Sequence, residues 1–418
     1  MISIQEYQQF CEEERGWTKA FRLAVEDLRG KGGGMLYVPA GEYDTYPVRL
    51  YSDITLYLET GALLKFYQNP EGFEIIAGEF EGERQKMYMP CIYAKDAENI
   101  CVAGGGIIDG SGSYWWEHKE ELQAARPYLM YFEGCRRVKV QDVRLLNSPA
   151  WTVHPLYCED VEIRGISIKN PKDSPNTDGI NPDSCRNVRI LDCLIDVGDD
   201  CITLKAGTED TPGKVSCENI TISNCNLLHG HGGVVIGSEM SGGVRNVAIS
   251  NCVFQDTDRG VRVKTRRGRG GVMERVVISN LIMENVVCPF TFNMYYRCGA
   301  QGTEYKSREV LPINGGTPGI RRIQIQNVMV HNASAAAGFF CGLPESPIED
   351  IMISDCTISM DPDGEAGEPA MLEDMKPVKG MGIFLQCVRN VAFRNVKLYG
   401  QRGEKIVTDD TVKGFEWE

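Results

Sequence analysis

Two adjacent carboxylates, Asp199 and Asp200, stand in the segment VGDDCITLK, where apolar residues follow them directly. Mutual repulsion and any partial burial raise the cost of ionising both, so at least one should have a raised pKa. A carboxyl group that stays protonated beside ionised ones is suited to acid/base chemistry, including cleavage of a glycosidic bond. The same pair could instead form a turn or a calcium site.

Three further segments carry unusual polar residues, and each belongs to a different copy of a repeat. They are NTDGINPDS with Asn176 and Asp178, GHGGVVIGS with His231, and DRGVRVKTRRGRGG with Arg262 and Lys264. The alternation of side chains along a strand sends Arg262 and Lys264 to the same side. Taken singly, Asn176 could be a ladder asparagine, His231 a turn residue and the arginine-rich stretch a solvated loop. Their occurrence on consecutive copies favours one strip of polar side chains.

The strands that must position these residues are predicted from a repeated sequence pattern. A charged or polar pair, then Val or Ile, then alternating apolar residues recur, as in CRRVKVQDVRL, CEDVEIRGISI and VRNVAISNCVF. Nine anchor residues are mostly 23 to 32 positions apart: Val138, Val161, Val188, Ile220, Val247, Val276, Ile323, Ile351 and Val391. The period of two predicts strands, and the repeat length predicts the stacked coils of a parallel β-helix.

We therefore predict an all-β protein, a single-stranded parallel β-helix that forms one domain over residues 1–418, with repeats over about 95–400. An apolar helical face precedes the repeats and consists of Trp17, Phe21, Ala24, Val25 and Leu28. Glycines at 32–34 follow it, so we expect a capping helix and turn over about 16–34. Insertions at about 66–90, 112–128, 299–319 and 361–380 are expected to be loops that leave the coil.

Composition limits the class of partner. The apolar fraction of 42% and the charged fraction of 24% are those of a soluble globular protein. No stretch approaches the roughly 20 apolar residues of a membrane span. A net charge of −14 argues against nucleic-acid and anionic-membrane binding, so an anionic partner needs a local basic patch.

The sixteen cysteines have neither zinc-ligand nor redox spacing, and we expect them to be small buried apolar residues. The start, MISIQEYQQFCEEERGW, lacks the basic and apolar regions of a secretory signal. We therefore expect a cytoplasmic protein, or a secreted one if a leader was removed.

The ordered polar segments resemble glycoside hydrolase family 28, the polygalacturonase family of the pectin-lyase-like superfamily. The family motifs NTDG, (G/Q)DD, GHG and RIK stand here at residues 176–179, 198–200, 230–232 and 262–264. Three match fully, and the fourth has Val in place of Ile. The resemblance continues through GGGMLYVPAGEY, NSPAWTVHP and IGSEMSGGVRNV, and it implies a right-handed parallel β-helix.

The resemblance also implies roles for the acidic residues. Asp199 would be the general acid that protonates the leaving oxygen, while Asp178 and Asp200 would hold and deprotonate the attacking water, with inversion at the anomeric carbon. His231 would hydrogen-bond near Asp199 and help to keep it protonated.

The remaining residues implied by the resemblance contact substrate. Arg262 and Lys264 would bind the carboxylate of a uronic acid. Asn176 is a further candidate for substrate binding, and so is Tyr296, with Tyr295 as the alternative. No metal or cofactor is expected.

The expected function is inverting hydrolysis of α-1,4-galacturonosyl linkages in pectic oligosaccharides, exo-acting from the non-reducing end, with the loop 299–319 as the block. Lys306 and Arg308 in that loop could contact a terminal sugar or be solvated. The alternatives are an endo-polygalacturonase, a rhamnogalacturonan or xylogalacturonan hydrolase, a calcium-dependent polysaccharide lyase and a non-catalytic carbohydrate-binding β-helix. The oligomeric state stays open.

Overall fold

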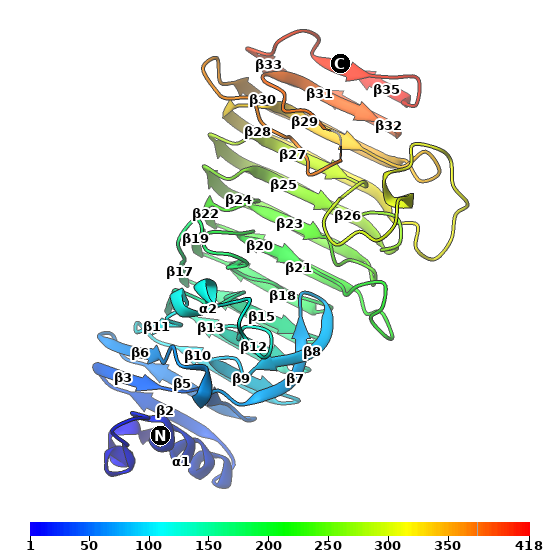
Figure 1. Cartoon of the computed structure of the whole chain (residues 1–418). Helices are drawn as coiled ribbons and strands as arrows, with labels where there is room; N and C mark the ends of the chain where they lie inside the picture. Colours follow the sequence, from blue (N-terminus) through cyan, green and yellow to red (C-terminus); the bar gives the residue numbers. More distant parts are fainter. Residues whose placement is uncertain (374) are drawn as a thin grey trace. The chain divides into compact units, whose positions relative to one another are not determined.

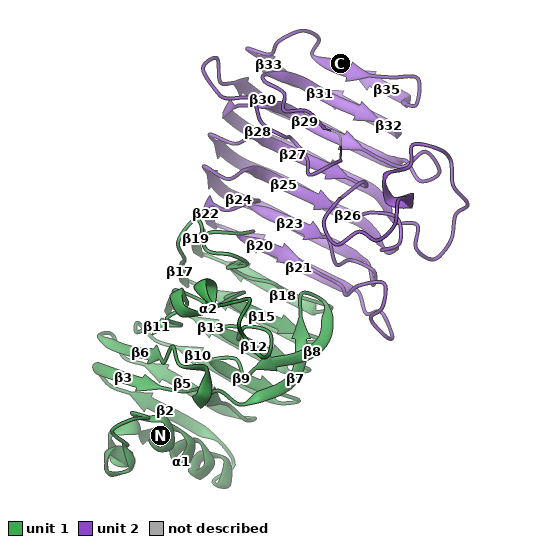
Figure 2. Cartoon of the chain, viewed as in Figure 1, with its two compact units in different colours: residues 1–199 green, residues 200–418 purple. Residues whose placement is uncertain are grey.

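The computed structural model describes residues 1–373 and 375–418, which divide into two compact units, residues 1–199 and 200–418 (Figure 2). In each unit, short strands pair in parallel with the strands one coil away along the chain (Figure 1). The predicted all-β, parallel β-helical class is confirmed. The single domain over residues 1–418 stays a prediction, and each unit is described by itself.

The first unit begins with elements that cover one end of its coils. They are β1 (Ile2–Ser3), the 3-10 helix η1 (Ile4–Phe10) and α1 (Thr18–Gly30). The buried face of α1 packs on β2 and β4 and consists of Ala20, Phe21, Ala24, Val25 and Leu28. The predicted capping helix is confirmed. In the turn after its end at Gly30, glycine is required at position 33, since φ is +114° and a Cβ there would lie 2.5 Å from the Asp53 carbonyl oxygen.

Three parallel stacks form the coils of the first unit. The first stack is β2 (Gly34–Val38), β5 (Ile54–Leu58), β10 (Glu98–Ala103), β13 (Arg136–Gln141), β16 (Glu159–Arg164) and β18 (Arg186–Leu191). The second is β3 (Gly41–Thr45), β6 (Ala62–Phe66), β11 (Ile107–Asp109), β14 (Arg144–Leu146), β17 (Ser167–Lys169) and β19 (Leu194–Val197). The third is β4 (Val48–Arg49), β9 (Ile92–Lys95), β12 (Met130–Glu133) and β15 (Val153–Leu156). The predicted anchors Val138, Val161 and Val188 are direct partners and are buried.

The second unit repeats this arrangement. One stack is β20 (Ile202–Leu204), β23 (Val234–Gly237), β25 (Arg259–Lys264), β27 (Cys288–Asn293), β29 (Ala336–Cys341), β31 (Met381–Gln386) and β34 (Ile406–Thr408). The other strands are β21 (Cys217–Ser223), β22 (Asn226–His229), β24 (Val244–Gln255), β26 (Val272–Glu284), β28 (Gly319–Ala333), β30 (Ile348–Met360), β32 (Val388–Arg394), β33 (Lys397–Tyr399) and β35 (Lys413–Trp417). β24, β26, β28 and β30 each continue through a corner of the coil.

An asparagine ladder marks that corner. Asn251, Asn280 and Asn327 have φ between +52° and +56°, a conformation that Asn tolerates better than most residues. The Asn327 side chain donates to Asn280 at 2.7 Å, and Asn280 donates to Asn251 at 3.1 Å. Cys252, which follows Asn251, points into the core and is buried. The repeated Asn-Cys pair thus places a polar ladder outside and a small apolar residue inside. All sixteen cysteines are free thiols.

Of the predicted insertions, the first contains a β-hairpin, and the other three carry little regular structure. Residues 66–90 contain the 3-10 helix η2 (Pro70–Gly72) and an antiparallel hairpin of β7 (Ile75–Phe80) and β8 (Glu83–Tyr88). Residues 112–128 contain α2 (Ser113–Glu117), and residues 299–319 contain η3 (Glu304–Lys306). The described part of 361–380 forms a loop closed by paired backbone hydrogen bonds between Gly367 and Val378; residue 374 lies outside the described residues.

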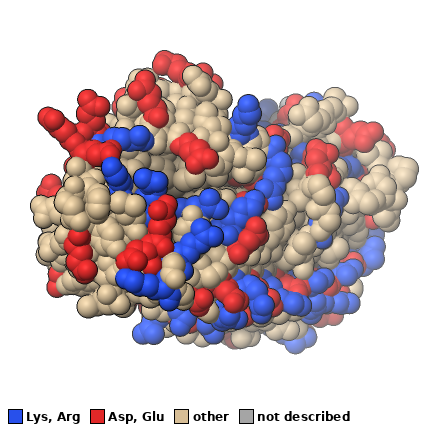
Figure 3. Space-filling view, turned by 90° about the horizontal axis from the view of Figure 1, so that it is seen from below, with Lys and Arg blue, Asp and Glu red and all other residues tan. Residues whose placement is uncertain are grey.

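The surface mixes charges of both signs. Figure 3 shows Lys and Arg interspersed with Asp and Glu on the face that it presents. Ion pairs between neighbouring coils contribute to this pattern, such as Arg189 with Glu162 at 2.7 Å. No helix within residues 1–373 and 375–418 is long and apolar enough to cross a membrane.

We predict that Asn280→Ala lowers the free energy of unfolding by about 2 kcal/mol. Alanine loses two side-chain hydrogen bonds and resists a positive φ. Asn280→Gly should cost only about 1 kcal/mol, because glycine accepts this conformation. Urea unfolding midpoints measure both, with Gln326→Ala, at an exposed strand position, as the control. Equal losses for the alanine and glycine variants would contradict the role assigned to the backbone conformation.

Candidate active site

In the first unit, the structure brings Asp178 and Asp199 together. One carboxylate oxygen of each lies within 4.8 Å of the other. Asp178 is 3% exposed and accepts a hydrogen bond of 2.8 Å from the Asn181 side chain, whereas Asp199 is half-buried. A pair this close is costly to ionise fully, which favours a shared or retained proton.

A bend at Gly198 places Asp199 beside the preceding coil. β19 ends at Val197 and no strand includes residues 198–201. A Cβ at Gly198 would lie 2.6 Å from the carbonyl oxygens of both Pro171 and Ser174. Only glycine therefore lets the chain pass this close to the segment that leads to Asp178.

The spacing of Asp178 and Asp199 bears on the chemistry. It is shorter than the roughly 6.5–9.5 Å between the carboxyl groups of most inverting glycosidases and nearer the roughly 5–5.5 Å of retaining ones. A water can still bridge the two oxygens, because two hydrogen bonds of about 2.8 Å span more than 4.8 Å. The same two carboxylates could instead ligate a cation, as the calcium-dependent alternative requires.

In the second unit, Asp200 is held by two cations. Its carboxylate is 1% exposed and accepts from Lys264 Nζ at 2.7 Å and from Arg262 Nη1 at 3.3 Å. Burial opposes the charge of Lys264, but Asp200 raises the pKa of Lys264 above its ordinary value. Because a buried charge is costly unless it is paired, the three groups stabilise one another in their ionised forms.

The backbone at residues 230–232 closes around this group. The carbonyl oxygen of His231 accepts from Arg262 at 3.5 Å, while the His231 side chain itself is exposed. A Cβ at Gly232 would lie 2.4 Å from Val235 and 3.3 Å from the Asp200 carboxylate. The GHG motif therefore combines an exposed imidazole with a glycine that makes room for Asp200.

Of the two adjacent tyrosines, Tyr296 belongs to this group. Its ring centre lies 5.5 Å from Lys264 Nζ and 5.8 Å from Arg262 Cζ, within reach of a cation–π interaction. Tyr295 instead packs under Arg308, whose guanidinium carbon is 3.9 Å from the ring centre. The structure thus separates the roles that the sequence left open for the pair.

Asn176 lies in the first unit, and protein groups use both ends of its side chain. Its Oδ1 accepts from Arg126 at 2.6 Å, and its Nδ2 donates to Glu81 at 2.8 Å. The backbone has φ of +55°. These contacts give Asn176 a part in shaping the turn before Asp178, and its contact with substrate stays a prediction.

The arginine-rich stretch after Lys264 is buried, contrary to the alternative of a solvated loop. Arg267 is 8% exposed and pairs with Glu345 through two hydrogen bonds of 2.6 and 2.9 Å. It also donates to the carbonyl oxygens of Glu304 and Ser307 in the insertion 299–319. Two neighbours act similarly, since Arg266 and Arg269 both bind Glu209.

Lys306 and Arg308 of the loop 299–319, which the sequence left as sugar contacts or solvated residues, both have protein partners. Lys306 pairs with Glu373 at 2.9 Å. Arg308 donates to Gln386 at 3.1 Å while it stacks on Tyr295. These contacts join the two long insertions of the second unit to each other and to β31.

Part of the predicted insertion 361–380, which the sequence did not connect with the site, lies beside Arg262 and Tyr296. We call residues 368–372 the strap, and it crosses β25 and β27. Its carbonyl oxygens accept hydrogen bonds from Arg259, Thr291 and Asn293, at 2.5, 2.8 and 3.1 Å. The Met371 sulfur lies 3.0 Å from Arg262 Nη2, and Leu372 forms a β-bridge with Tyr296.

A second buried ion pair was also missed. Lys205 Nζ donates to Glu239 at 2.7 Å, and Arg269 lies 3.9 Å from the same carboxylate. Burial opposes the charge of Glu239, but Lys205 and Arg269 outweigh it and lower the pKa of Glu239 to about 2. The only signal in the sequence was a lone lysine and a lone glutamate in otherwise apolar or small-residue runs, ITLK and IGSEM.

Comparison with known proteins shows the family of the chain. A model of the family described as "Glycosyl hydrolases family 28" matches residues 47–366. A probable polygalacturonase of Vitis vinifera is 33% identical over 82% of this chain and 71% of its own length. A probable polygalacturonase of Arabidopsis thaliana is 34% identical over 68% of this chain, which spans only 58% of that relative.

Solved structures share the architecture. A hyperthermoactive exopolygalacturonase from Thermotoga maritima is 29% identical, with a TM-score of 0.79 over 96% of this chain and 92% of its own. A family 28 exopolygalacturonase of Yersinia enterocolitica is 20% identical, with a TM-score of 0.82 over 99% of this chain and 77% of its own. These neighbours confirm the predicted right-handed parallel β-helix.

We predict that Glu239→Gln makes the free energy of unfolding less dependent on pH below about pH 5. Lowering the Glu239 pKa from 4.5 to about 2 stabilises the fold above about pH 4.5, by on the order of 3 kcal/mol, and this is lost as the pH falls toward 2. Between about pH 5 and pH 3 the wild type should lose about 2 kcal/mol more than the variant. Urea unfolding across this range measures the difference, with exposed Glu365→Gln as the control. Parallel curves for wild type and variant would refute the shift.

Proposed function

Because the chain belongs to the glycosyl hydrolases of family 28, glycosidases that hydrolyse pectin, we propose that it hydrolyses α-1,4-galacturonosyl linkages in oligogalacturonides. The observation that carries this proposal is the arrangement of the three aspartates. Asp178 and Asp199 share a close contact in one unit, while the next residue, Asp200, is locked between Lys264 and Arg262 in the other. One peptide bond joins the two groups.

The environments of the aspartates support different roles. Asp199 is the only half-buried one, so it is open to the glycosidic oxygen and acts as general acid. Asp178 and Asp200 are buried acceptors that orient and deprotonate the attacking water, which gives inversion at the anomeric carbon. Lys264 and Arg262 hold the Asp200 carboxylate in place, and His231 assists Asp199 as general acid.

A carboxylate on the sugar fits the cationic side of the site. Lys264 has three N–H donors and uses one for Asp200, which leaves donors for a uronate. Tyr296 lies over the same cations and provides an aromatic surface for the sugar ring. The relatives named as polygalacturonases and exopolygalacturonases support this substrate class.

The strap supports exo-action more directly than the insertion 299–319 does. In the strand register, Arg262 pairs with Thr291 and Lys264 with Asn293, and the strap is bound to Thr291 and Asn293. The strap thus covers the strand next to the cations, about 4.8 Å away, in addition to contacting Arg262, and we infer that it closes the groove on that side. A chain with little room on one side is cleaved near its end, and we assign the non-reducing end.

Asp199→Asn should lower kcat on tetragalacturonide by at least about 10²-fold and leave the unfolding midpoint unchanged, because the amide keeps the shape but has no proton to donate. Exposed Asp173→Asn, in the same segment as Asp178, serves as the matched control. Initial rates and urea unfolding measure the two properties. A near wild-type rate for Asp199→Asn would remove it from the mechanism.

A tetragalacturonide labelled at its reducing end tests the cleavage mode. We expect unlabelled monogalacturonate from the first turnover, initially as the β-anomer in proton NMR because an inverting enzyme reverses the α-linkage. A labelled monomer would mean attack at the reducing end, and early intermediate oligomers from a long galacturonan would mean endo-action. An α-anomer would mean retention, and an ultraviolet-absorbing unsaturated product would mean a lyase.

A further inference from the structure

Beyond the strap, the second unit contains a pocket of about 420 Å³. We call it the Phe384 pocket; its lining includes Phe339, Phe384, Leu372, Met375, Lys376 and Arg308. Along the strands, Arg262 pairs with Thr291, Thr291 with Phe339 and Phe339 with Phe384. The pocket floor is thus two to three coils from Arg262, and the strap lies on the intervening coil.

The floor of the pocket is aromatic and fixed. Phe339 on β29 and Phe384 on β31 stack with ring centres 4.9 Å apart and planes 15° from parallel. Phe339 is buried, while Phe384 is half-buried and leaves part of its surface open. A ligand with an apolar face can remove that surface from water.

The walls are cationic on a chain whose net charge is −14. Among the described residues of its lining, the three cations Lys306, Arg308 and Lys376 and the carboxylate of Glu373 give a formal charge of 3 − 1 = +2. Glu373 is occupied by Lys306 and by the Tyr305 hydroxyl, and these two hydrogen bonds lower its pKa. Glu373 therefore neutralises Lys306 rather than the other two cations.

The other two cations, Arg308 and Lys376, differ in how firmly the protein holds them. Arg308 is held by Gln386 and Tyr295, so its guanidinium is already oriented. Lys376 is exposed and forms no ion pair with any residue of 1–373 or 375–418. A fixed guanidinium and an unpaired ammonium beside an aromatic floor suit a ligand with one carboxylate and one apolar face.

We propose that the Phe384 pocket binds one uronate ring of an acidic oligosaccharide and holds it without cleaving it. The ring lies on Phe384, and its carboxylate lies between Lys376 and Arg308. The proposal rests on the proposed function for its ligand class, since uronates are the sugars met at Arg262 and Lys264. It adds a second site of contact that lies beyond the strap.

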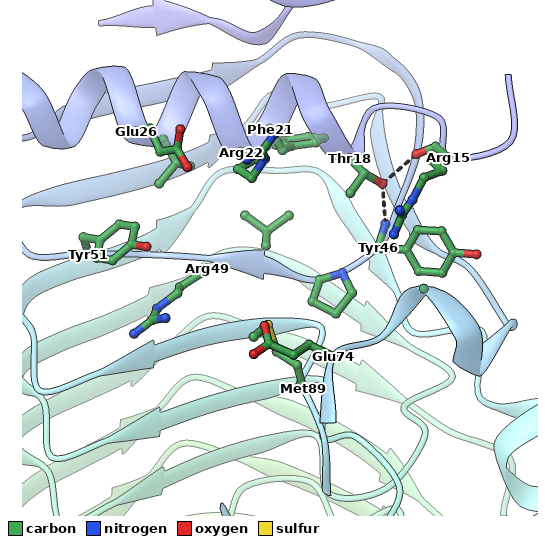
Figure 4. A pocket seen from close by; sticks show the side chains of 14 residues that line it. Arg15, Thr18, Phe21, Arg22, Glu26, Tyr46, Arg49, Tyr51, Glu74 and Met89 are labelled. Carbon is green, nitrogen blue, oxygen red and sulfur yellow. Dashed lines mark hydrogen bonds between the residues drawn. The ribbon is translucent and has the colours of Figure 1, made fainter. Parts of the chain in front are cut away.

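A pocket of about 330 Å³ in the first unit provides a comparison (Figure 4). Arg15, Arg22 and Arg49 surround it, but Glu26 and Glu74 also face it, so its formal charge is 3 − 2 = +1. Its floor is built largely from α1 and the strand region around Arg49, without an open pair of stacked rings. Met89 lines this pocket and reports on it independently.

Methyl-labelled methionine resolves these sites in one titration. Met375 and Met381 line the Phe384 pocket, Met371 contacts Arg262, and Met89 lines the first-unit pocket. Methyl NMR of the full chain is followed while galacturonate is added, with neutral galactose as the control ligand. We expect saturable shifts of Met375 and Met381 with galacturonate and none with galactose.

Variants test the charge contact. Lys376→Gln should weaken galacturonate binding at Met375 and Met381 by about two- to fivefold, and the control Lys379→Gln, in the same loop but outside the pocket lining, should not. Unchanged Met375 and Met381 signals, equal shifts with galactose, or no effect of Lys376→Gln would overturn the proposal. Turnover and shifts of Met371 report separately on the proposed function, so the two can fail independently.

Discussion

Parallel pairing in register is the constraint on which the rest of this molecule depends. Val247, Val276, Ile323 and Ile351 are direct partners on successive strands. This pairing sets the register, and therefore the partner on the next coil, for the other residues of those strands. A side chain at one point of a coil must then face its counterpart about 4.8 Å away. Residues far apart in the chain can thus form one polar strip without long-range packing of their own.

Register also explains why charge is concentrated where it is. Like charges on neighbouring coils repel, as at Asp178 and Asp199, whereas buried Asp200 is paired with the opposite charges of Lys264 and Arg262. The arginines that follow Lys264 are also buried and paired with carboxylates. Arg267 uses Glu345 and backbone carbonyl oxygens to fix an insertion that the coil itself does not hold.

The repeated elements of the fold could be predicted from the sequence, whereas contacts outside the repeat could not. The strands, the anchor residues and the cap helix follow from periodicity and apolar faces. The burial of Arg267 and the strap contacts of Arg259 join residues 78 and 109 positions apart outside any period, so no local pattern encodes them. The sequence likewise could not distinguish the surroundings of the two adjacent tyrosines. In the structure the strap contacts Tyr296, whereas Arg308 stacks on Tyr295.

The strap shows how an insertion can change a groove without disturbing the coil beneath it. Thr291 and Asn293 keep their places in the strand ladder and donate only their side chains to the carbonyl oxygens of Pro369 and Met371. Backbone hydrogen bonds alone hold the strands together, so the outward side-chain donors are available to a loop that offers acceptors. Met371 of the strap touches Arg262, and Arg262 in turn pairs with Asp200. One arginine therefore connects an insertion on the outside of the coil with a carboxylate buried beneath it.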